Sequence, residues 1–346
     1  MRWPLATCLC LACAPADDTA VDAAVEDVPG CDPTAKFWTV WVANQAEGVD
    51  AIFVVHPHDT DLVHIQDTIP VGRAPHNLAF TPDGRLAYVA NLSSPVEPGT
   101  VSVIDTQSRA VIATVGAGVT PHSVRVTPDG RFAWVANIGS DDVTVIDTGT
   151  NETTRTMAVG DGPAQVAFTP TGVKGYVSNG DEGSVSAVDA TTLAVLQRIP
   201  TGRGSMGLVT RQDGRFVFET EPLDDRLSII DTTTDVVVTA LTFGGTLRQP
   251  HGLALAGNEL LVTNATAESL AFVDTTTFEL TGSVAVSGRP QLVAVSPDCT
   301  RAYLTLQDSP AVSVVDIRER RVLGTIDLGE GSVHGIAVLP PAGATP

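Results

Sequence analysis

A period of about 42 residues runs through most of this 346-residue chain. Six aspartates that each follow a β-branched or apolar run lie 42, 42, 42, 43 and 42 residues apart: Asp105, Asp147, Asp189, Asp231, Asp274 and Asp316. A fixed period of this length indicates a repeat architecture, in which no unit can bury its apolar face without its neighbours. We interpret the aspartates as turn caps at strand ends, because a structural repeat requires one per unit.

Each unit contains the pattern of four short strands. An alternating segment leads into a Pro-Asp-Gly turn, as at 82–84 and 128–130, and an aromatic and valine-rich strand follows it. A polar loop, the strand that ends in the aspartate and a last apolar alternation such as 110–115 complete the unit. The glycine supplies the positive φ that a tight hairpin needs. Four antiparallel strands at this spacing predict an all-β fold, the radial β-propeller.

Counting the units predicts seven blades. Six full units begin near residues 73, 119, 161, 203, 246 and 289. Residues 36–72 supply three more strands, at 37–44, 51–55 and 62–69, but no inner one, and residues 333–339 repeat the inner-strand pattern. We therefore expect one seven-bladed propeller over residues 36–339, closed by strand 333–339 pairing with the N-terminal blade, and a tail at 340–346.

The strand after each turn carries a recurrent motif. It reads Tyr-Val-Ala-Asn at 88–91, Trp-Val-Ala-Asn at 134–137, Tyr-Val-Ser-Asn at 176–179 and Leu-Val-Thr-Asn at 261–264. With the Pro-His pairs that precede the turns, this pattern closely resembles the YVTN family of β-propeller repeats over residues 36–339. The resemblance implies a bacterial extracytoplasmic protein. Because related seven-bladed propellers include lactonases, a streptogramin-type lyase and metal-bearing redox enzymes, it leaves the function open.

Composition excludes several classes of function. There are 20 Lys and Arg against 40 Asp and Glu, a formal charge of −20, so nucleic acid would be repelled. An apolar fraction of 43% is ordinary for a folded protein, and no uncharged apolar run is long enough to span a membrane. The sequence also has no Gly-rich phosphate loop, Cys-x-x-Cys-His haem motif or Gly-x-Ser-x-Gly elbow.

The start of the chain predicts export. A basic residue and an apolar stretch at 3–12 have the form of a short secretory signal peptide over residues 1–12. Leu-Ala-Cys at 11–13 is similar to the end of a lipoprotein signal, which would make Cys13 the lipidated residue of a cell-envelope protein, although Cys10 stands where that pattern usually has leucine. Plain export and a cytosolic protein are the alternatives. Residues 13–35 have the composition of a flexible tether.

Two cysteines, Cys31 and Cys299, belong to the body of the protein. Export favours a disulfide between them, and two unpaired thiols are the alternative. In the expected topology Cys299 lies in the hairpin after the inner strand of blade seven, and the chain from Cys31 enters blade one from the same rim. We therefore predict a disulfide that joins the two ends of the propeller.

Aligning the units brings histidines together around the axis. The position after the inner-strand proline of the repeat holds, from blade one to blade seven, His334, His76, His122, Ala164, Met206, His251 and Gln291, the seven residues called the hub ring below. Neutral imidazoles from neighbouring strands suit zinc or copper. The four histidines could thus form a metal or catalytic site, bind a ligand, or cap neighbouring loops as part of the repeat. We favour the last interpretation, so no cofactor is firmly implied.

Two further sets contain candidate residues. A second ring, at the ends of the second strands, holds Asn44, Asn91, Asn137, Asn179, Glu221, Asn264 and Leu306. These side chains would line a polar mouth or cap turns, and Glu221 could act as general base in a lactonase-like hydrolysis. An outer turn of blade one contains His56, His58, Asp59, Asp61 and His64, which we interpret as a solvated loop rather than a metal site.

The sequence therefore predicts a non-enzymatic, envelope-anchored propeller that presents one face to an envelope protein or a small ligand. A metal-dependent or lactonase-like enzyme that uses the histidines is the first alternative, and a structural surface or adhesion module is the second. Contact with a membrane is expected only through the lipid anchor.

Overall fold

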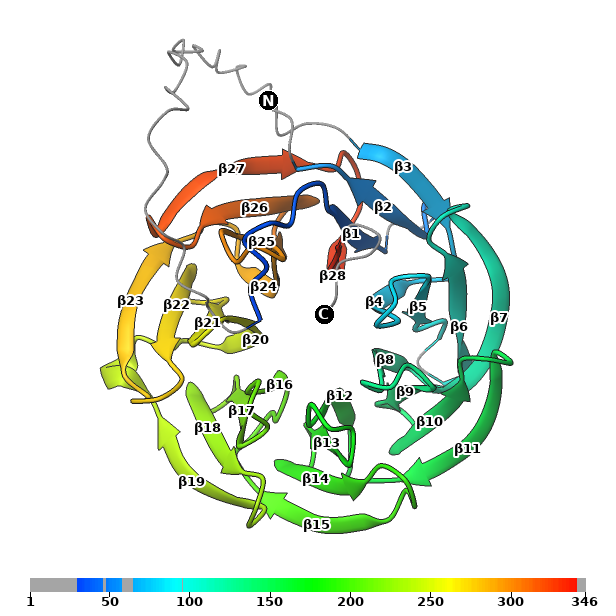
Figure 1. Ribbon diagram of the computed structural model, residues 1–346, viewed down its shortest axis with the longest axis horizontal. Helices are drawn as coiled ribbons and strands as arrows, with labels where there is room; N and C mark the ends of the chain where they lie inside the picture. The colour runs from blue at the N-terminus through cyan, green and yellow to red at the C-terminus, as the bar shows by residue number, and fades with distance from the viewer. Residues whose placement is uncertain (1–29, 46–47, 58–64, 95, 341–346) are drawn as a thin grey trace, which may run out of the picture.

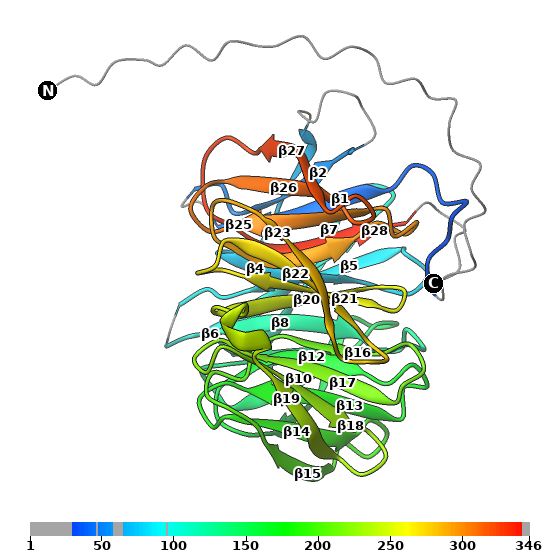
Figure 2. The same ribbon diagram turned by 90° about the vertical axis from the view of Figure 1, so that its left-hand side faces the viewer.

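Seven four-stranded antiparallel sheets surround a central axis in the computed structural model, which describes residues 30–45, 48–57, 65–94 and 96–340 (Figure 1). The first strand of each sheet lies nearest the axis and the fourth lies at the rim. Figure 2 shows the same blades from the side. The predicted fold class, the number of strands in a blade and the number of blades are confirmed.

Blade one is built from both ends of the chain. Its strands, in spatial order, are β28 (Val333–Leu339), β1 (Thr39–Asn44), β2 (Ala51–Val55) and β3 (Ile65–Pro70). β28 pairs antiparallel with β1, with Val40 opposite Val338. The predicted closure is therefore confirmed, and backbone hydrogen bonds join the two ends of the ring. β1 begins two residues later than predicted, because Phe37 has a left-handed φ of 69° that a strand does not accommodate.

The other six blades follow in chain order. Blade two contains β4 (Pro75–Phe80), β5 (Leu86–Asn91), β6 (Pro98–Asp105) and β7 (Ala110–Val119). Blade three contains β8 (Pro121–Val126), β9 (Phe132–Asn137), β10 (Asp142–Asp147) and β11 (Glu152–Ala158). Blade four contains β12 (Pro163–Phe168), β13 (Lys174–Asn179), β14 (Ser184–Asp189) and β15 (Val195–Pro200). Blade five contains β16 (Leu208–Thr210), β17 (Phe216–Glu221), β18 (Arg226–Asp231) and β19 (Val236–Leu241). Blade six contains β20 (Pro250–Ala256), β21 (Glu259–Asn264), β22 (Ser269–Asp274) and β23 (Leu280–Ala285). Blade seven contains β24 (Pro290–Val295), β25 (Arg301–Leu306), β26 (Ala311–Asp316) and β27 (Arg321–Asp327).

The apolar core lies between adjacent blades. The residue that opens the motif is aromatic on every second strand except β21, and it is among the largest fully buried side chains, as for Trp134, Tyr88 and Tyr176. Burial of each such ring stabilises the fold by about 1.5–3 kcal/mol. The Tyr88 hydroxyl donates to Asn151 Oδ1 at 2.7 Å and the Tyr176 hydroxyl to Asp235 Oδ1 at 2.7 Å, both on the next blade. One aromatic position thus supplies both apolar contact and a polar bond between blades.

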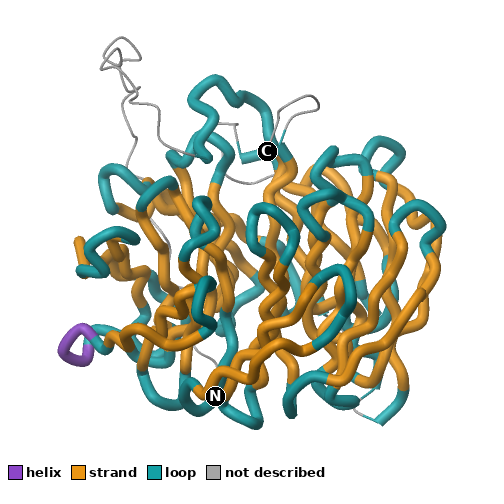
Figure 3. The backbone as a smooth tube through the Cα atoms, turned by 60° about the horizontal axis from the view of Figure 1, so that its bottom comes forward, coloured by secondary structure: helices purple, strands orange, loops and turns teal. Residues whose placement is uncertain are grey.

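Regular structure in the described residues is almost entirely strand (Figure 3). One 3-10 turn, η1 (Phe243–Gly245), lies between β19 and β20. In the part of the chain that the structure describes, no helix is long and apolar enough to cross a membrane. The predicted leader with Cys13, most of the tether, residues 58–64 of the outer turn and tail residues 341–346 lie outside the described residues.

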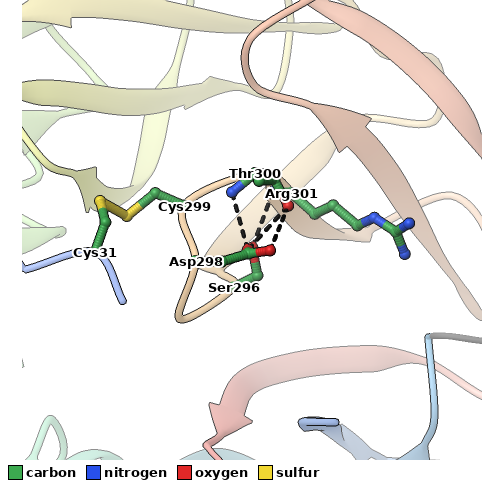
Figure 4. The surroundings of a disulfide bond; sticks show 6 residues. All are labelled: Cys31, Ser296, Asp298, Cys299, Thr300 and Arg301. Carbon is green, nitrogen blue, oxygen red and sulfur yellow. Dashed lines mark hydrogen bonds between the residues drawn. A yellow bond between two sulfur atoms is a disulfide. The ribbon is translucent and has the colours of Figure 1, made fainter. Parts of the chain in front are cut away.

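The predicted disulfide between Cys31 and Cys299 is present, with a Cα–Cα distance of 5.4 Å (Figure 4). The segment from Cys31 is also held to blade seven by a backbone bond from Asp32 N to Pro297 O at 2.7 Å. A little further on, Trp38 Nε1 donates to the Tyr303 hydroxyl at 3.0 Å. The entry of the chain into blade one is therefore fixed to blade seven independently of the β28–β1 pairing.

Candidate functional site at the hub

The inner strands of six blades, all except blade five, have a bulge next to their hub-ring residue. In blade two, for example, the pairing of β4 with β5 shifts between Pro75 and Asn77, which leaves His76 out of the ladder. The same shift occurs in blades three, four, six and seven. An unpaired bulge residue has a carbonyl free to accept a bond from elsewhere. At the hub that acceptor faces the neighbouring blade.

The carbonyls of the hub ring accept hydrogen bonds from the preceding blade. The donor and acceptor pairs, with their distances, are His76 Nδ1 to His122 O, 2.8 Å; His122 Nδ1 to Ala164 O, 2.8 Å; Ser178 Oγ to Met206 O, 2.7 Å; Thr220 Oγ1 to His251 O, 2.8 Å; and Thr263 Oγ1 to Gln291 O, 2.5 Å. These five bonds join consecutive blades from two to seven, whereas His334 Nδ1 of blade one is buried without a hydrogen bond of ordinary geometry.

Two alternative residues supply the donor. In blades two and three the donor is the hub-ring histidine, and the second strand has alanine, Ala90 or Ala136, before its asparagine. In blades four and five the hub-ring residue has no suitable donor, and the residue before the second-strand asparagine or its counterpart is Ser178 or Thr220. The histidines of blades two and three are therefore structural, as the favoured interpretation of the sequence holds.

Blade six has both kinds of donor. Thr263 bonds the Gln291 carbonyl, and His251 Nδ1 is buried without a hydrogen bond of ordinary geometry. His251 faces the Gln291 carbonyl, to which Thr263 donates, and makes no bond as well formed as those of its counterparts His76 and His122.

Three of the histidine rings stack on one side of the hub. The His76 ring centroid lies 4.0 Å from that of His122 and 3.8 Å from that of His334, whereas His251 lies 6.4 Å from His334. Burial is the main cause that lowers the pKa of His122 and of His251 to about 4 and that of His334 to about 3. Burial and the neighbouring imidazoles lower the pKa of His76 well below its usual range. All four rings are therefore neutral at pH 7.

The histidines do not fit the zinc or copper site considered from the sequence. A tetrahedral site needs ring nitrogens that converge on one point about 2.0–2.1 Å away. The planes of His76 and His334 are tilted by only 33° at close contact, so their lone pairs lie side by side, and Nδ1 of His76 already bonds a carbonyl. Among the described residues, no group of three or more His, Cys, Asp and Glu side chains is arranged to hold a metal ion.

The asparagines of the second ring are buried in the blades instead of lining an open mouth. Asn44, Asn91, Asn137, Asn179 and Asn264 all have 0% exposure. Asn179, for example, donates to Ser184 and Ser186 of its own blade at 2.9 and 3.0 Å, and its Oδ1 accepts from Gly160 N at 3.1 Å. Of the two interpretations of this ring, a polar mouth is wrong, because the amide side chains are buried and bond within the blade or to the loop that enters its inner strand, as Asn179 and Asn44 do. Their role is to hold the turn.

Glu221 is likewise unavailable to a substrate. It is fully buried, forms an ion pair with Arg226 and accepts from the Ser228 hydroxyl. The adjacent Glu219 is also fully buried, and burial, followed by the charge of Glu221, raises the pKa of Glu219 well above its usual range. A general base must reach the proton it removes, so this geometry does not support the predicted role of Glu221.

A cavity of about 350 Å³ opens at the hub over blades four to seven. Of the four hub-ring histidines, only His251 lines this cavity. Ala164, Met206 and Gln291 are the other hub-ring residues in its wall. Loops above the ring add Asp181, Leu223, Gln249, Arg289 and Gln307. Its wall therefore combines apolar side chains, three amides, one carboxylate and one guanidinium.

The sequence analysis missed most of this wall. It considered the hub ring and the second ring, whereas Asp181, Gln249, Arg289 and Gln307 lie in the loops between them. One signal was present, since Arg289 and Gln249 directly precede the inner-strand prolines, where blade four has Gly162. Because blades two to four have the smaller residues Ala74, Thr120 and Gly162 at this position, a long polar side chain here indicates a feature specific to blades six and seven.

Comparison with known proteins is consistent with this architecture. Solved structures similar to the chain include the periplasmic gluconolactonase PpgL of Pseudomonas aeruginosa, at 19% identity and a TM-score of 0.74, with 90% of this chain and 100% of that one covered. A functionally unknown protein from Desulfotomaculum acetoxidans is 18% identical, with a TM-score of 0.73 and coverages of 88% and 99%. Hydrazine synthase of Kuenenia stuttgartiensis is 18% identical, with a TM-score of 0.67 and coverages of 78% and 91%. At these identities the likeness concerns the fold alone.

The sequence comparisons concern the middle of the chain. A search of curated proteins finds no match. Residues 93–258 match the model of the family described as YNCE-like beta-propeller. The central region of this chain is therefore similar to the YNCE-like β-propellers, the YVTN-type architecture that its repeats predict.

Proposed function

We propose that this protein is an exported binding protein that holds a small molecule in the hub cavity over blades four to seven. The observation that carries the proposal is the asymmetry of the hub. The stacked rings of His334, His76 and His122 occupy one side, and the cavity of about 350 Å³ opens over the other, where the hub ring has Ala164, Met206 and Gln291. Seven equivalent blades would leave the same space on every side of the axis, so a cavity on one side reflects residues that are specific to those blades.

The wall of the cavity has the character of a binding site for a small compound. Such sites are concave, of about 300–1,000 Å³, with apolar walls and a few placed polar groups. Met206 and Leu223 supply apolar surface, and the amides of Gln249, Gln291 and Gln307 supply donors and acceptors. Because no base–nucleophile pair is recognised in this wall, we propose binding without turnover rather than the lactonase-like or metal-dependent reaction.

Export is a separate part of the proposal. The disulfide between Cys31 and Cys299 supports an oxidising compartment, since such bonds persist mainly outside the cytosol. We propose that the leader is removed before Cys13 and that a lipid on this residue anchors the protein to the cell envelope. Labelling with a palmitate analogue should mark the wild-type protein and not the Cys13→Ser variant. Equal labelling of both would contradict the anchor.

The binding proposal is tested by filling the cavity. Met206→Trp places a large ring in the wall, and Leu196→Trp makes a similar change on the exposed face of β15 as a matched control. Thermal unfolding is measured with a panel of sugars, sugar acids, amino acids and nucleosides. A compound present at 100 times its Kd stabilises the fold by about 2.7 kcal/mol, which raises the Tm by several degrees.

We expect at least one compound of the panel to raise the Tm of the wild type and of Leu196→Trp but not that of Met206→Trp. A panel without any hit, or a hit that stabilises Met206→Trp equally, would overturn the proposed site.

A further inference from the structure

Arg289 is an unusual cation in the wall of the cavity. On the neighbouring loops Arg203 pairs with Asp224 at 2.8 Å and Arg248 with Asp225 at 3.2 Å. Arg289 is partly buried and has no carboxylate partner within 4.0 Å among the described residues; its Nη2 makes only a long contact of 3.4 Å with Gln249 Oε1. In a protein of formal charge −20, a cavity arginine that is left without an acidic side chain is arranged to receive an anion.

His251 adds a neutral hydrogen-bonding group to the same wall. His76 and His122 each donate from Nδ1 to a carbonyl, which leaves their Nε2 as an acceptor only. In blade six Thr263 donates to the corresponding carbonyl, and His251 Nδ1 makes no hydrogen bond of ordinary geometry with it. The neutral ring carries one proton and one lone pair, so it can donate to a ligand or accept from one.

The wall of the cavity also contains a negatively charged side chain, that of Asp181. Asp181 comes from the loop after β13 in blade four, whereas Arg289 comes from the loop before β24 in blade seven. One ligand that satisfies both ends has a carboxylate at one end and a hydroxyl or amino donor at the other. The volume of about 350 Å³ limits it to a compound of metabolite size.

We propose that the ligand is a small carboxylic acid bearing hydroxyl or amino groups, whose carboxylate is bound by Arg289 with His251 as a further hydrogen-bonding contact. This inference rests on the proposed function and adds the chemical class of the ligand to it. Asp181 receives the donor groups of the same molecule, and Met206 and Leu223 pack against its carbon skeleton.

The test uses matched pairs of compounds that differ in the carboxylate. Gluconate is compared with sorbitol, and glutamine with glutaminol, by isothermal titration of the full-length protein. The variants are Arg289→Gln and, as a control with the same loss of charge, Arg73→Gln, an exposed residue of the loop before β4 that does not line the cavity. We expect one acid to bind at least tenfold more tightly than its alcohol, and Arg289→Gln to abolish this difference while Arg73→Gln preserves it.

His251 is tested alongside by His251→Ala, with His122→Ala as its counterpart. We expect His251→Ala to weaken acid binding about tenfold with little change in Tm, and His122→Ala to lower the Tm because it removes the bond to Ala164. Wild-type affinity in His251→Ala would remove His251 from the site.

The outcomes separate the two proposals. Suppose that Met206→Trp abolishes binding, but that the wild type binds an acid and its alcohol with equal affinity, or that Arg289→Gln binds the acid with wild-type affinity. The cavity then remains a binding site, and the carboxylate inference is overturned. Failure of every compound in the wider panel instead overturns the proposed function itself.

Discussion

The hydroxyl of Thr263 donates a 2.5 Å hydrogen bond to the main-chain carbonyl of Gln291 on the next blade. The same hydroxyl accepts from Gly252 N at 2.8 Å, so it fills the bulge of its own inner strand and reaches across the blade interface. Thr220 makes the equivalent pair of bonds, to Gly207 N and to the His251 carbonyl. These two threonines differ in what stands beside them, since blade six has His251 as a second donor and blade five has Met206.

Replacing the two threonines by valine should therefore have unequal effects. Both variants lose the acceptor for a buried amide, but in Thr263→Val the freed Gln291 carbonyl can accept from His251 Nδ1. In Thr220→Val the freed carbonyl has Met206 as its nearest hub-ring neighbour in blade five and stays unsatisfied. We expect Thr220→Val to be more destabilising than Thr263→Val by about 1–2 kcal/mol, the cost of a buried unpaired carbonyl. Chemical denaturation with urea measures both.

The structural account of the hub depends on that inequality. If Thr263→Val lost as much stability as Thr220→Val, His251 would not be able to replace the hydroxyl. If His251 does replace the hydroxyl, the double variant His251→Ala, Thr263→Val should lose as much stability as Thr220→Val, because it has neither donor.

The repeat made the fold predictable to the level of single strands. The six aspartates fixed equivalent positions, and the missing inner strand of blade one required β28 to pair with β1, as it does. Turn chemistry was equally local, and Asp105 accepts from Ser108 N at 2.7 Å as a cap should. These features depend on residues close in sequence or on a count of units, and both can be read from one chain.

The candidate site was less predictable because its character depends on differences between blades. The sequence placed His76 and His122 at the hub but could not show that a histidine on the first strand compensates for an alanine on the second. That relation joins positions about 14 residues apart through a contact with a third residue on another blade.

Acidification should destabilise the protein through the hub histidines. The pKa of His122 and of His251 is about 4 in the folded state, and that of an unfolded histidine is about 6.5. The unfolded chain therefore binds more protons between these values, and stability is complete above about pH 6.5 and falls as the pH drops toward 4. Each ring contributes up to about 1.4 kcal/mol per pH unit in that window.

Urea titrations at intervals from pH 7 to pH 4.5 measure this dependence. His122→Gln removes one titrating ring and should lower the slope of unfolding free energy against pH, even though its stability at pH 7 is also lower. A wild-type stability that is constant between pH 6.5 and 4.5 would show that the rings are not buried as neutral groups.

Glu219 should act in the opposite direction. Its pKa is raised above the ordinary value of 4.5, so the folded state holds a proton that the unfolded chain releases, and stability falls as the pH rises above about 4.5. A glutamine is neutral at every pH and similar in shape. Glu219→Gln should therefore gain stability relative to the wild type with rising pH, by up to about 1.4 kcal/mol per unit.

Two controls define the effect of Glu219→Gln. Glu221→Gln weakens the ion pair with Arg226 and should be destabilising at pH 7, while the exposed Glu279→Gln should be neutral. Destabilisation by Glu219→Gln at pH 8 would mean that its carboxyl is ionised in the folded protein.

The two cysteines of the disulfide should respond differently to substitution. The bond closes a span of 268 residues, for which loop entropy gives an upper stabilisation of about 5 kcal/mol. Cys299 also has a φ of 57° at the turn position where Gly84, Gly130 and Gly172 have φ of 68°, 74° and 69°. A left-handed conformation costs a side chain roughly 1–2 kcal/mol, part of which the greater freedom of an unfolded glycine offsets.

Cys31→Ser loses the disulfide and keeps the backbone strain at residue 299, whereas Cys299→Gly loses the disulfide and relieves that strain. Both should unfold at lower urea than the oxidised wild type, with Cys299→Gly the more stable of the two by up to about 1 kcal/mol. Reduction of the wild type should match Cys31→Ser, and a reducing agent that left the unfolding midpoint unchanged would mean that the staple adds nothing beyond β28 and Trp38.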